Sequence, residues 1–342
     1  MSITIIPLSE ADHAGVLQLL ATFWQRGWTE PLMEDYFAWR YGSRGDGETL
    51  VACDRGRSVG ILDSFIRRFW IDGRQGIVRE TCDWFCLPQY QALGVGLHLM
   101  RRMMAKPEPI LLLGGSQTTL DLMPRLKWAR LPNAERFLLS VSARDAAGRV
   151  AQHLGRCGVT LARMIPDARL IRRIRREPPP SATAQVRRRE FGAAIEEIAE
   201  ISPYDFAPWL DTATLDWLAS APEVLGEFVL LSFFSDRKLV GVSVSRLQQL
   251  AFGSQAHIVH VHAERLALVD WIVSETVHHL IDRGAGAVAC ETSCPATSRA
   301  LDALGFVRRR AVQAHWWHAD KRPPSGVLNL TTLRADDALG FA

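Results

Sequence analysis

The feature of this 342-residue sequence that most constrains its fold is an internal repeat. The segments LVACDRGRSVGILDSF, MEDYFAWRY and LLLGGSQTTLDLMPRLKWARL resemble VLLSFFSDRKLVGVSVSRL, TATLDWLAS and VACETSCPATSRALDALGFVRR in the second half. Trp39 and Trp217 are 178 positions apart (217 − 39), and Gly60 and Gly241 are 181 apart (241 − 60). A near-constant offset through several elements indicates that one domain is duplicated.

Chain length agrees with this interpretation, because 342 residues suit about two domains. We expect a first domain over residues 1–145, a connecting helix and linker over 146–185, and a second domain over 186–342. The run Pro178 to Pro180 cannot continue a helix and marks the linker. Seven arginines between residues 172 and 189 flank these prolines. We interpret them as a solvated helix end and a strand start rather than as a phosphate-binding group.

Composition excludes several classes of protein. The sequence is 48% hydrophobic and 23% charged, with a formal net charge of +3, which is too mild to indicate a nucleic-acid partner. No stretch approaches the roughly 18 apolar residues of a membrane span, and the N-terminus lacks the basic region of a signal peptide. Six scattered cysteines indicate a reduced, cytoplasmic protein. The four-residue spacings Cys82–Cys86 and Cys290–Cys294 lack paired histidines, so we predict no metal site.

Local patterns predict the elements of the first half. A short strand near the start precedes a helix capped at Ser9, and a second helix over 30–42 opens near Pro31. Three antiparallel strands follow over 48–88, divided by hairpin turns at 54–57 and 72–73. A helix over 95–106, a buried strand over 109–115 and a short helix complete the half.

A short glycine loop connects the third antiparallel strand to the helix. The stretch CLPQYQALGVGLHLM, Cys86 to Met100, passes from strand to helix through Gln91 to Gly96. Strand, glycine loop and helix together make an anion site, because loop N–H groups turn toward the ligand and the helix N-terminus adds partial positive charge. A simple glycine turn is the alternative.

The order of elements resembles the GCN5-related N-acetyltransferase (GNAT) family. The residues that carry the resemblance are Gln91, Gly94 and Gly96 in the pattern Q/R-x-x-G-x-G/A, after a strand that ends at Pro88. The resemblance implies an α+β (α/β) fold of two tandem GNAT-like domains. Each would be a mixed, mostly antiparallel sheet flanked by helices.

The resemblance implies acetyl-CoA as a co-substrate. Backbone N–H groups would hold its pyrophosphate at Gln91, Ala92, Leu93, Gly94, Val95 and Gly96. A side chain at Gly94 or Gly96 would block the phosphates. Pantetheine would pair with the splayed edge of the preceding strand at Trp84, Phe85, Cys86 and Leu87. Ser116 would contact the CoA arm or, alternatively, cap the following helix.

Two carboxylates are candidate general bases for acyl transfer to an amine. The family often has a glutamate on the strand before the loop, and Glu80 is at the matching place. Asp83 is the second candidate, and strict alternation would put it on the opposite face. The alternative for Glu80 is an exposed residue paired with an arginine across the sheet. The family's usual tyrosine acid is missing from 118–129, which leaves the acid undefined; Tyr90 is in the loop.

The second half departs from the family pattern. Glu264 and Arg265 stand where the loop would be, and an acidic residue is wrong for pyrophosphate. We interpret this half as a GNAT-shaped domain without a cofactor site. Its histidines at 257, 260 and 262 could suggest a metal, but packed or exposed strand residues explain them better. Trp316 and Trp317 are predicted as core rather than as a sugar platform.

The sequence thus favours an acetyl-CoA-dependent N-acyltransferase whose first domain binds CoA. Tandem relatives imply a small-molecule or saccharide acceptor, and the segment YFAWRYG tilts the expectation toward an amino sugar or polysaccharide precursor. The competing hypothesis is a non-catalytic CoA-binding or scaffold protein. The sequence decides neither the acceptor nor the oligomeric state.

Overall fold

The structure is a computed structural model that describes residues 2–24, 29–42, 47–143, 146–147, 182–187, 195, 198, 200–250, 253–320 and 322–332. Its internal contacts divide it into two compact units. Among the described residues, unit 1 comprises 2–132 and 313–324, and unit 2 comprises 133–312 and 325–332. Most of the expected linker over 146–185, with its prolines and its arginines, lies outside the described residues.

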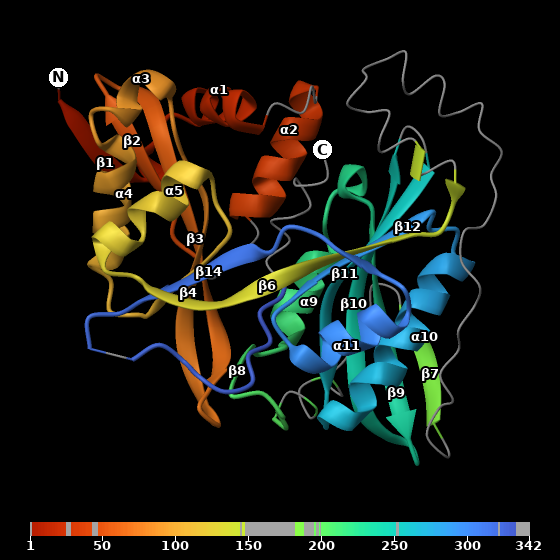
Figure 1. Cartoon of the computed structure of the whole chain (residues 1–342). Helices are drawn as coiled ribbons and strands as arrows, with labels where there is room; N and C mark the ends of the chain where they lie inside the picture. Colours follow the sequence, from red (N-terminus) through yellow and green to blue (C-terminus); the bar gives the residue numbers. More distant parts are fainter. Residues whose placement is uncertain are drawn as a thin grey trace. The chain divides into compact units, whose positions relative to one another are not determined.

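Unit 1 is built on a mixed sheet in the order β1-β2-β3-β4-β5-β14, in which only β4 and β5 run parallel (Figure 1). Its strands are β1 (Ile3–Pro7), β2 (Leu50–Asp54), β3 (Arg57–Ile71), β4 (Arg74–Cys86), β5 (Ile110–Leu113) and β14 (Val312–Trp317). Its helices are α1 (His13–Trp24), α2 (Glu30–Phe37), α3 (Pro88–Gln91), α4 (Val95–Met104) and α5 (Gln117–Leu122), with short helical turns η1 (Leu8–Glu10), η2 (Ala38–Gly42) and η3 (Pro124–Leu126).

Helices cover both faces of this sheet. A Cβ at Gly60 of β3 would lie 3.3 Å from Leu99 of α4, so the glycine lets α4 approach one face. On the other face, Phe23 of α1 stacks on Phe85 of β4 with ring centroids 4.7 Å apart. Arg40 of η2 lies over the ring of Phe65 of β3. The core of unit 1 therefore has two layers, one on each side of β2, β3 and β4.

Turn and cap chemistry agrees with the sequence at most positions. The β2–β3 turn has positive φ at Arg55 and Gly56, and the β3–β4 turn has it at Asp72 and Gly73, as two-residue hairpins require. The predicted cap at Ser9 is wrong. Helix α1 starts at His13, and Asp12 accepts a hydrogen bond of 2.8 Å from the N–H of Gly15.

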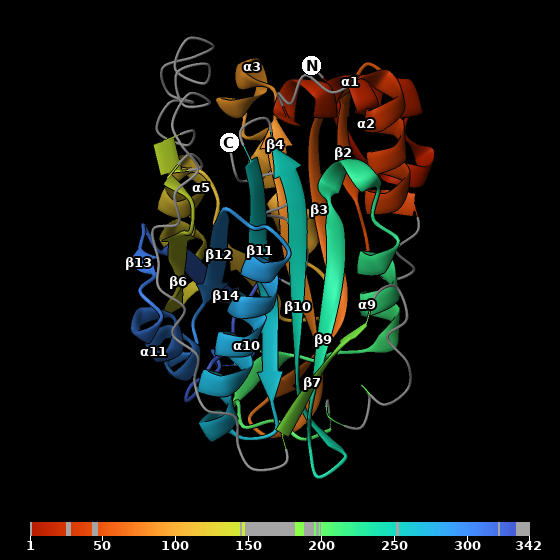
Figure 2. The ribbon, with the colours of Figure 1, turned by 90° about the vertical axis from the view of Figure 1, so that its right-hand side faces the viewer.

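Unit 2 repeats the same plan, with sheet order β6-β12-β11-β10-β9-β7, and Figure 2 shows β9, β10 and β11 side by side with α10 against them. Its strands are β6 (Ala129–Ser140), β7 (Ala182–Arg187), β8 (Phe206–Pro208), β9 (Glu227–Ser235), β10 (Lys238–Leu250), β11 (Gly253–Ala263), β12 (Ala287–Thr292) and β13 (Val307–Arg308). Its helices are α9 (Thr212–Ala219), α10 (Val269–Asp282) and α11 (Pro295–Ala303), with turns η4 (Glu223–Leu225) and η5 (Leu266–Leu268).

The duplicated glycines occupy matching places. Gly60 lies on β3 and Gly241 on β10, the middle strand of each antiparallel trio. A Cβ at Gly241 would lie 2.2 Å from Ile272 of α10, just as one at Gly60 would meet Leu99 of α4. In both units the glycine lets the following helix pack against the sheet. The sequence offset therefore reflects a shared packing requirement.

Each unit contains one strand that comes from the other half of the chain. β14, from the end of the chain, pairs antiparallel with β5 in unit 1. β6, from the first half, pairs antiparallel with β12 in unit 2 over Glu135–Ser140. The compact units therefore do not follow the predicted boundaries at residues 145 and 186, because each contains a strand from the other half of the chain. The two boundaries stay a prediction. Because strand pairing across sequence-distant segments is invisible to local patterns, the sequence could not reveal this exchange.

Two predictions about tryptophans and membrane spans can be checked here. Trp316 is 2% exposed, as expected for core, whereas Trp317 is only partly buried. No helix among the described residues is long and apolar enough to cross a membrane.

A backbone difference between the units gives a stability prediction. Lys127 ends η3 with φ +61°, and Gly305 has φ +86° at the matching place after α11. The left-handed conformation costs a non-glycine residue about 1 kcal/mol. Lys127 is exposed. The variant Lys127→Gly should therefore have a free energy of unfolding up to about 1 kcal/mol higher, measured by urea denaturation. Lys127→Ala is the control and should show no gain. An equal gain in both variants would assign the effect to the side chain rather than to the backbone.

Candidate functional site

The predicted anion loop is a tight turn into α4. Gln91 ends the four-residue helix α3, and Gly94 precedes α4 with φ +72°, a conformation that glycine adopts without strain. A Cβ at Gly94 would meet no atom within 4 Å. Gly94 is therefore required for its backbone conformation, and the expectation that a side chain there would block the phosphates stays a prediction.

The first turn of α4 presents donors without a cap. Gly94 at the N-cap offers no side chain to the N–H groups of this turn, and the N–H of Gly96 bonds to the thiol of Cys86. A separate packing contact favours glycine at position 96. A Cβ there would lie 3.2 Å from Nε1 of Trp84, which donates a hydrogen bond of 3.0 Å to the carbonyl of Gly96. This bond fixes the end of β4 against the helix N-terminus, and the combination can bind an anion.

Charged groups of the β2–β3 turn lie beside the loop. The hydroxyl of Tyr90 donates to Oδ2 of Asp54 over 3.0 Å. This hydrogen bond raises the pKa of Tyr90, and the neighbouring positive charges of Arg57 and Arg55 act in the opposite direction. Two cationic side chains are thus near Tyr90 of α3, together with the carboxylate of Asp54. The sequence analysis gave these arginines no role, because a hairpin turn distant in sequence supplies them.

β4 and β5 diverge toward the loop. Their parallel pairing runs from Arg79–Ile110 to Thr81–Leu112, and β4 then continues to Cys86 without β5 beside it. The four residues expected to pair with pantetheine follow this point: Trp84, Phe85, Cys86 and Leu87. Phe85 faces Phe23, and Cys86 and Leu87 are each 8% exposed. An unpaired strand edge can accept another extended chain by backbone hydrogen bonds.

A β-bulge lies where the two strands separate. Across β3 and β4, Ile61 pairs with Phe85 and Asp63 with Cys82, so Asp83 and Trp84 together oppose Leu62 alone. Asp83 takes φ +45°, in the left-handed region. A bulge of this kind bends the strand and re-aims the bulged side chain.

The bulge turns Asp83 toward the α1–α2 face. Its Oδ2 accepts hydrogen bonds from Tyr41 Oη at 2.9 Å and from Arg40 Nε at 3.3 Å. Arg40 lies over Phe65, which pairs directly with Glu80. The expectation that alternation separates Asp83 from Glu80 is therefore wrong, because the extra residue breaks the period of two.

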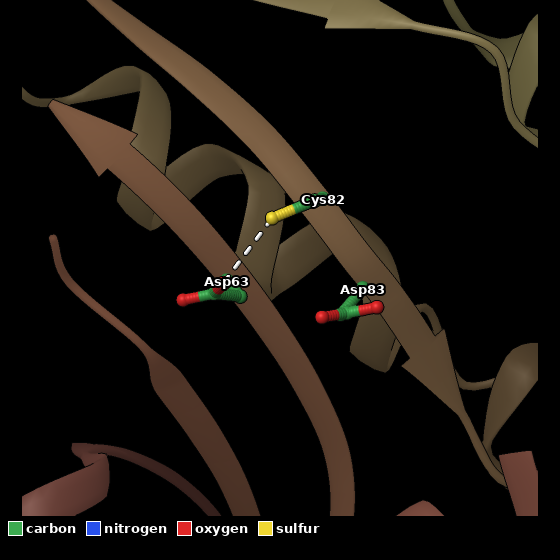
Figure 3. Close-up of side chains that lie close together, drawn as sticks. All are labelled: Asp63, Cys82 and Asp83. Carbon is green, nitrogen blue, oxygen red and sulfur yellow. Dashed lines mark hydrogen bonds between the residues drawn. The ribbon is translucent and has the colours of Figure 1, made fainter. Parts of the chain in front are cut away.

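Asp83 belongs to a buried cluster with Asp63 and Cys82 (Figure 3). The Sγ of Cys82 donates to Asp63 over 3.2 Å, and Thr49 Oγ1 donates to the same carboxylate over 2.6 Å. Potential ligand atoms of Asp63, Cys82 and Asp83 lie within 4.8 Å of one another. They are engaged with protein donors, so we interpret the group as a hydrogen-bonded cluster and not as a metal centre.

Tyr41 is the tyrosine whose hydroxyl contacts Asp83 of this cluster. Burial raises its pKa well above 10, and the carboxylates of Asp83 and Asp63 raise it further while Arg40 opposes them. Its hydroxyl therefore stays protonated at neutral pH and donates to Asp83. The sequence analysis missed Tyr41 and Arg40. Their only signal was the aromatic segment YFAWRYG, and the π-helical turn η2 that places them was not foreseeable from it.

Glu80 has a different environment. It is 2% exposed, and its Oε2 lies 3.6 Å from Nε of Arg67 on the neighbouring strand. The arginine partner expected in the structural alternative is present, although Glu80 is buried and not exposed. Breaking a buried ion pair leaves one uncompensated charge, which is strongly destabilising. Its surroundings therefore fit a structural role.

The last cofactor candidate is Ser116, which caps α5 by accepting a hydrogen bond of 3.2 Å from the N–H of Thr119. The hydroxyl also lies 3.1 Å from that of Thr119. The capping alternative thus holds, and a contact with the CoA arm stays a prediction.

The second unit differs at the position of the loop. Glu264 pairs with Lys238 at 2.9 Å, and η5 replaces the glycine turn before α10. Its three strand histidines, His257, His260 and His262, are 2%, 0% and 1% exposed. Among the described residues, the one group with metal-ligand geometry is the cluster at Asp63, and these histidines are not in it. They are packed strand residues, as predicted.

Comparisons with known proteins identify the fold. No model of a protein family and no curated protein sequence matches the chain. Solved structures do match it. A GCN5-related N-acetyltransferase from Anabaena variabilis has a TM-score of 0.61 at 11% identity, covering 92% of this chain and 72% of its own.

Two further structures have the same arrangement. A tandem GNAT protein from the clavulanic acid biosynthesis pathway has a TM-score of 0.54 at 12% identity, covering 94% of this chain and 100% of its own. Saccharomyces cerevisiae N-myristoyltransferase with bound myristoyl-CoA has a TM-score of 0.59 at 8% identity, covering 92% and 82%. These likenesses span almost the whole chain, which has the tandem fold of the GCN5-related N-acetyltransferases.

Proposed function

We propose that unit 1 is an acyl-CoA-dependent N-acyltransferase. The observation that carries the proposal is the coincidence of three features along β4. An uncapped helix N-terminus, an unpaired strand edge and a bulged carboxylate follow one another between Asp83 and Leu97. A pyrophosphate, a peptide-like arm and a reacting thioester are linked in the same order in acyl-CoA. The bound myristoyl-CoA of the yeast neighbour agrees with this class of donor.

Each part of the donor has a matching feature in the protein. The N–H groups of Val95 and Leu97, in the first turn of α4, are the donors that we propose for pyrophosphate, and Arg55 and Arg57 lie near Tyr90 of the preceding helix. The backbone of 84–87 supports the pantetheine amides as an added strand would. Acetyl-CoA is the donor we propose, because the resemblance to the acetyltransferases includes the loop pattern itself.

Asp83 is our candidate for the group that receives the acceptor amine. It accepts a hydrogen bond from the amine, whose lone pair attacks the thioester carbonyl. As the C–N bond forms, the nitrogen becomes acidic and its proton passes to the carboxylate, directly or through one water. The C–S bond then breaks, and the thiolate takes up a proton. A thiol pKa of about 8.5 makes this last step easy at neutral pH.

Arg40 and Tyr41 act as positioning residues in this scheme. Both donate to Oδ2 of Asp83, so they fix the position of its carboxylate. The acid-rich surroundings suit a cationic amine before it loses a proton. An amino sugar or a polysaccharide precursor is the acceptor class that we propose from the sequence.

The loop assignment can be tested by one isosteric pair of variants. Both Gly94→Asn and Gly94→Asp accept the left-handed conformation at φ +72°, and a Cβ there meets no atom within 4 Å. Only the second adds a negative charge beside the phosphates. Isothermal calorimetry with acetyl-CoA should therefore give a dissociation constant at least about tenfold larger for Gly94→Asp than for Gly94→Asn. Equal affinities would mean that the pyrophosphate lies elsewhere.

The catalytic assignment can be tested by a second pair. Asp83→Asn keeps the shape of the side chain but cannot take a proton, and we expect it to lower turnover by roughly 10²- to 10⁴-fold without changing acetyl-CoA affinity. Both variants should lower stability, because Arg40 and Arg67 each lose a buried counter-charge. Glu80→Gln is therefore the matched control for that loss. Its turnover per folded molecule should be retained. The reverse pattern would make Glu80 the base.

Turnover requires an acceptor, which a screen can supply. Release of the CoA thiol from acetyl-CoA is followed while amino sugars, amino acids and small polyamines are added in turn. Acceleration by one class, abolished in Asp83→Asn, supports the enzyme. Tight acetyl-CoA binding without acceleration by any amine would instead favour the alternative, a CoA-binding or scaffold protein, which the missing family tyrosine motivates.

A further inference from the structure

Unit 2 has the same strand divergence as unit 1. Parallel pairing of β11 with β12 ends at Ile258 and Cys290, after which β11 continues to Ala263. A shift in the β10–β11 register also leaves Val259 as an extra residue, between Ile258 and His260. β11 and β12 therefore separate beside a bulge, as β4 and β5 do. We call the space between the strand ends 259–263 and 291–293 the groove of unit 2.

Residues of the C-terminal segment 328–332 lie in contact with both sides of this groove. Toward β12, Ser293 N–H donates to the carbonyl of Leu330 over 3.2 Å, and Ser293 Oγ donates to that of Leu328 over 3.0 Å. The N–H of Leu330 donates back to Ser293 Oγ over 2.8 Å. One serine thus holds three polar atoms of the segment.

Toward β11, the side chains of the segment reach strand carbonyls. Asn329 Nδ2 donates to the carbonyl of Val261 over 3.0 Å, and Thr332 Oγ1 to that of Val259 over 3.4 Å. Thr331 Oγ1 lies 2.9 Å from Nδ1 of His260. Asn329 and Thr332 are each 1% exposed, so these bonds are in the interior of the unit.

The other side of the segment is also paired. The N–H of Asn329 donates to the carbonyl of Phe206, and Leu328 forms a parallel bridge with Phe206. Asp205 Oδ2 accepts from the N–H of Val327 over 2.7 Å and would be struck by a Cβ at Gly326, which fixes how the segment enters. The segment is therefore held by backbone and side-chain bonds along its length.

We propose that residues 328–332 occupy the groove of unit 2 as a built-in peptide, at the place that corresponds to the pantetheine site of unit 1. The comparison of the two grooves rests on the function proposed for unit 1. The carboxamide of Asn329 supplies an N–H to a β11 carbonyl, which is the kind of bond a pantetheine amide would make. Unit 2 is thereby closed to acyl-CoA and complete without a ligand.

Hydrogen exchange of the full chain tests this proposal without any need for activity. In the absence of ligand, the amides of Asn329 and Leu330 should be protected like those of β11. Ser293→Ala should raise their exchange rate about tenfold, because two hydrogen bonds to the segment are lost. Ser243→Ala is the matched control, a buried serine of the same unit whose Oγ lies 2.7 Å from Thr276 and not at the segment. It should leave the exchange of 329–330 unchanged.

Acetyl-CoA supplies the second arm of the same experiment. Saturation should slow exchange at 84–87 of β4 and leave 329–330 unchanged. Unprotected amides at 329–330 in the free protein, or faster exchange there with acetyl-CoA, would overturn the proposal. A lack of any effect at 84–87 would instead contradict the function proposed for unit 1. If Ser293→Ala fails to fold, Asn329→Ala, which removes the donor to Val261, replaces it with the same expected result.

Discussion

The β-bulge in β4 is the constraint on which the site depends. By inserting one extra residue opposite Leu62, it bends the strand away from β5 and holds Asp83 in a left-handed conformation. The bend opens the strand edge that leads to α4, and the same residue carries the carboxylate that meets Arg40 and Tyr41. The proposed cofactor edge and the proposed reactive group thus depend on a single irregularity, so we expect a regular strand here to remove both.

The two units share one arrangement of strands and helices but differ where two of the strands separate. Both have the middle-strand glycine that admits a helix, the parallel pairing that ends early, and a displaced register beside it. They differ in what satisfies the polar groups exposed by the divergence. Neither α4 nor α10 has a side-chain cap at its N-terminus, but in unit 2 the strand carbonyls bond to Asn329 and Thr332. Because buried polar groups require partners, each groove must be filled by something.

Prediction from the sequence succeeded where the signal was local or repeated. Hairpin turns at Gly56 and Gly73, the glycine before α4 and the offset between Gly60 and Gly241 all describe backbone needs that a few residues express. It failed where the determinant is a long-range pairing. The exchange of β6 and β14, the bulge at Asp83 and the approach of Tyr41 depend on residues far apart in the sequence. Alternation therefore assigned Asp83 to the wrong face.

The central claim is that unit 1, and not unit 2, binds acyl-CoA along β4 and the N-terminus of α4. A crystal structure of the full chain grown with saturating acetyl-CoA tests it most directly. The account predicts one cofactor per chain, with pyrophosphate oxygens accepting from the N–H groups of Val95 and Leu97 and the thioester beside Asp83. A cofactor bound between β11 and β12, or a pyrophosphate remote from α4, would contradict it.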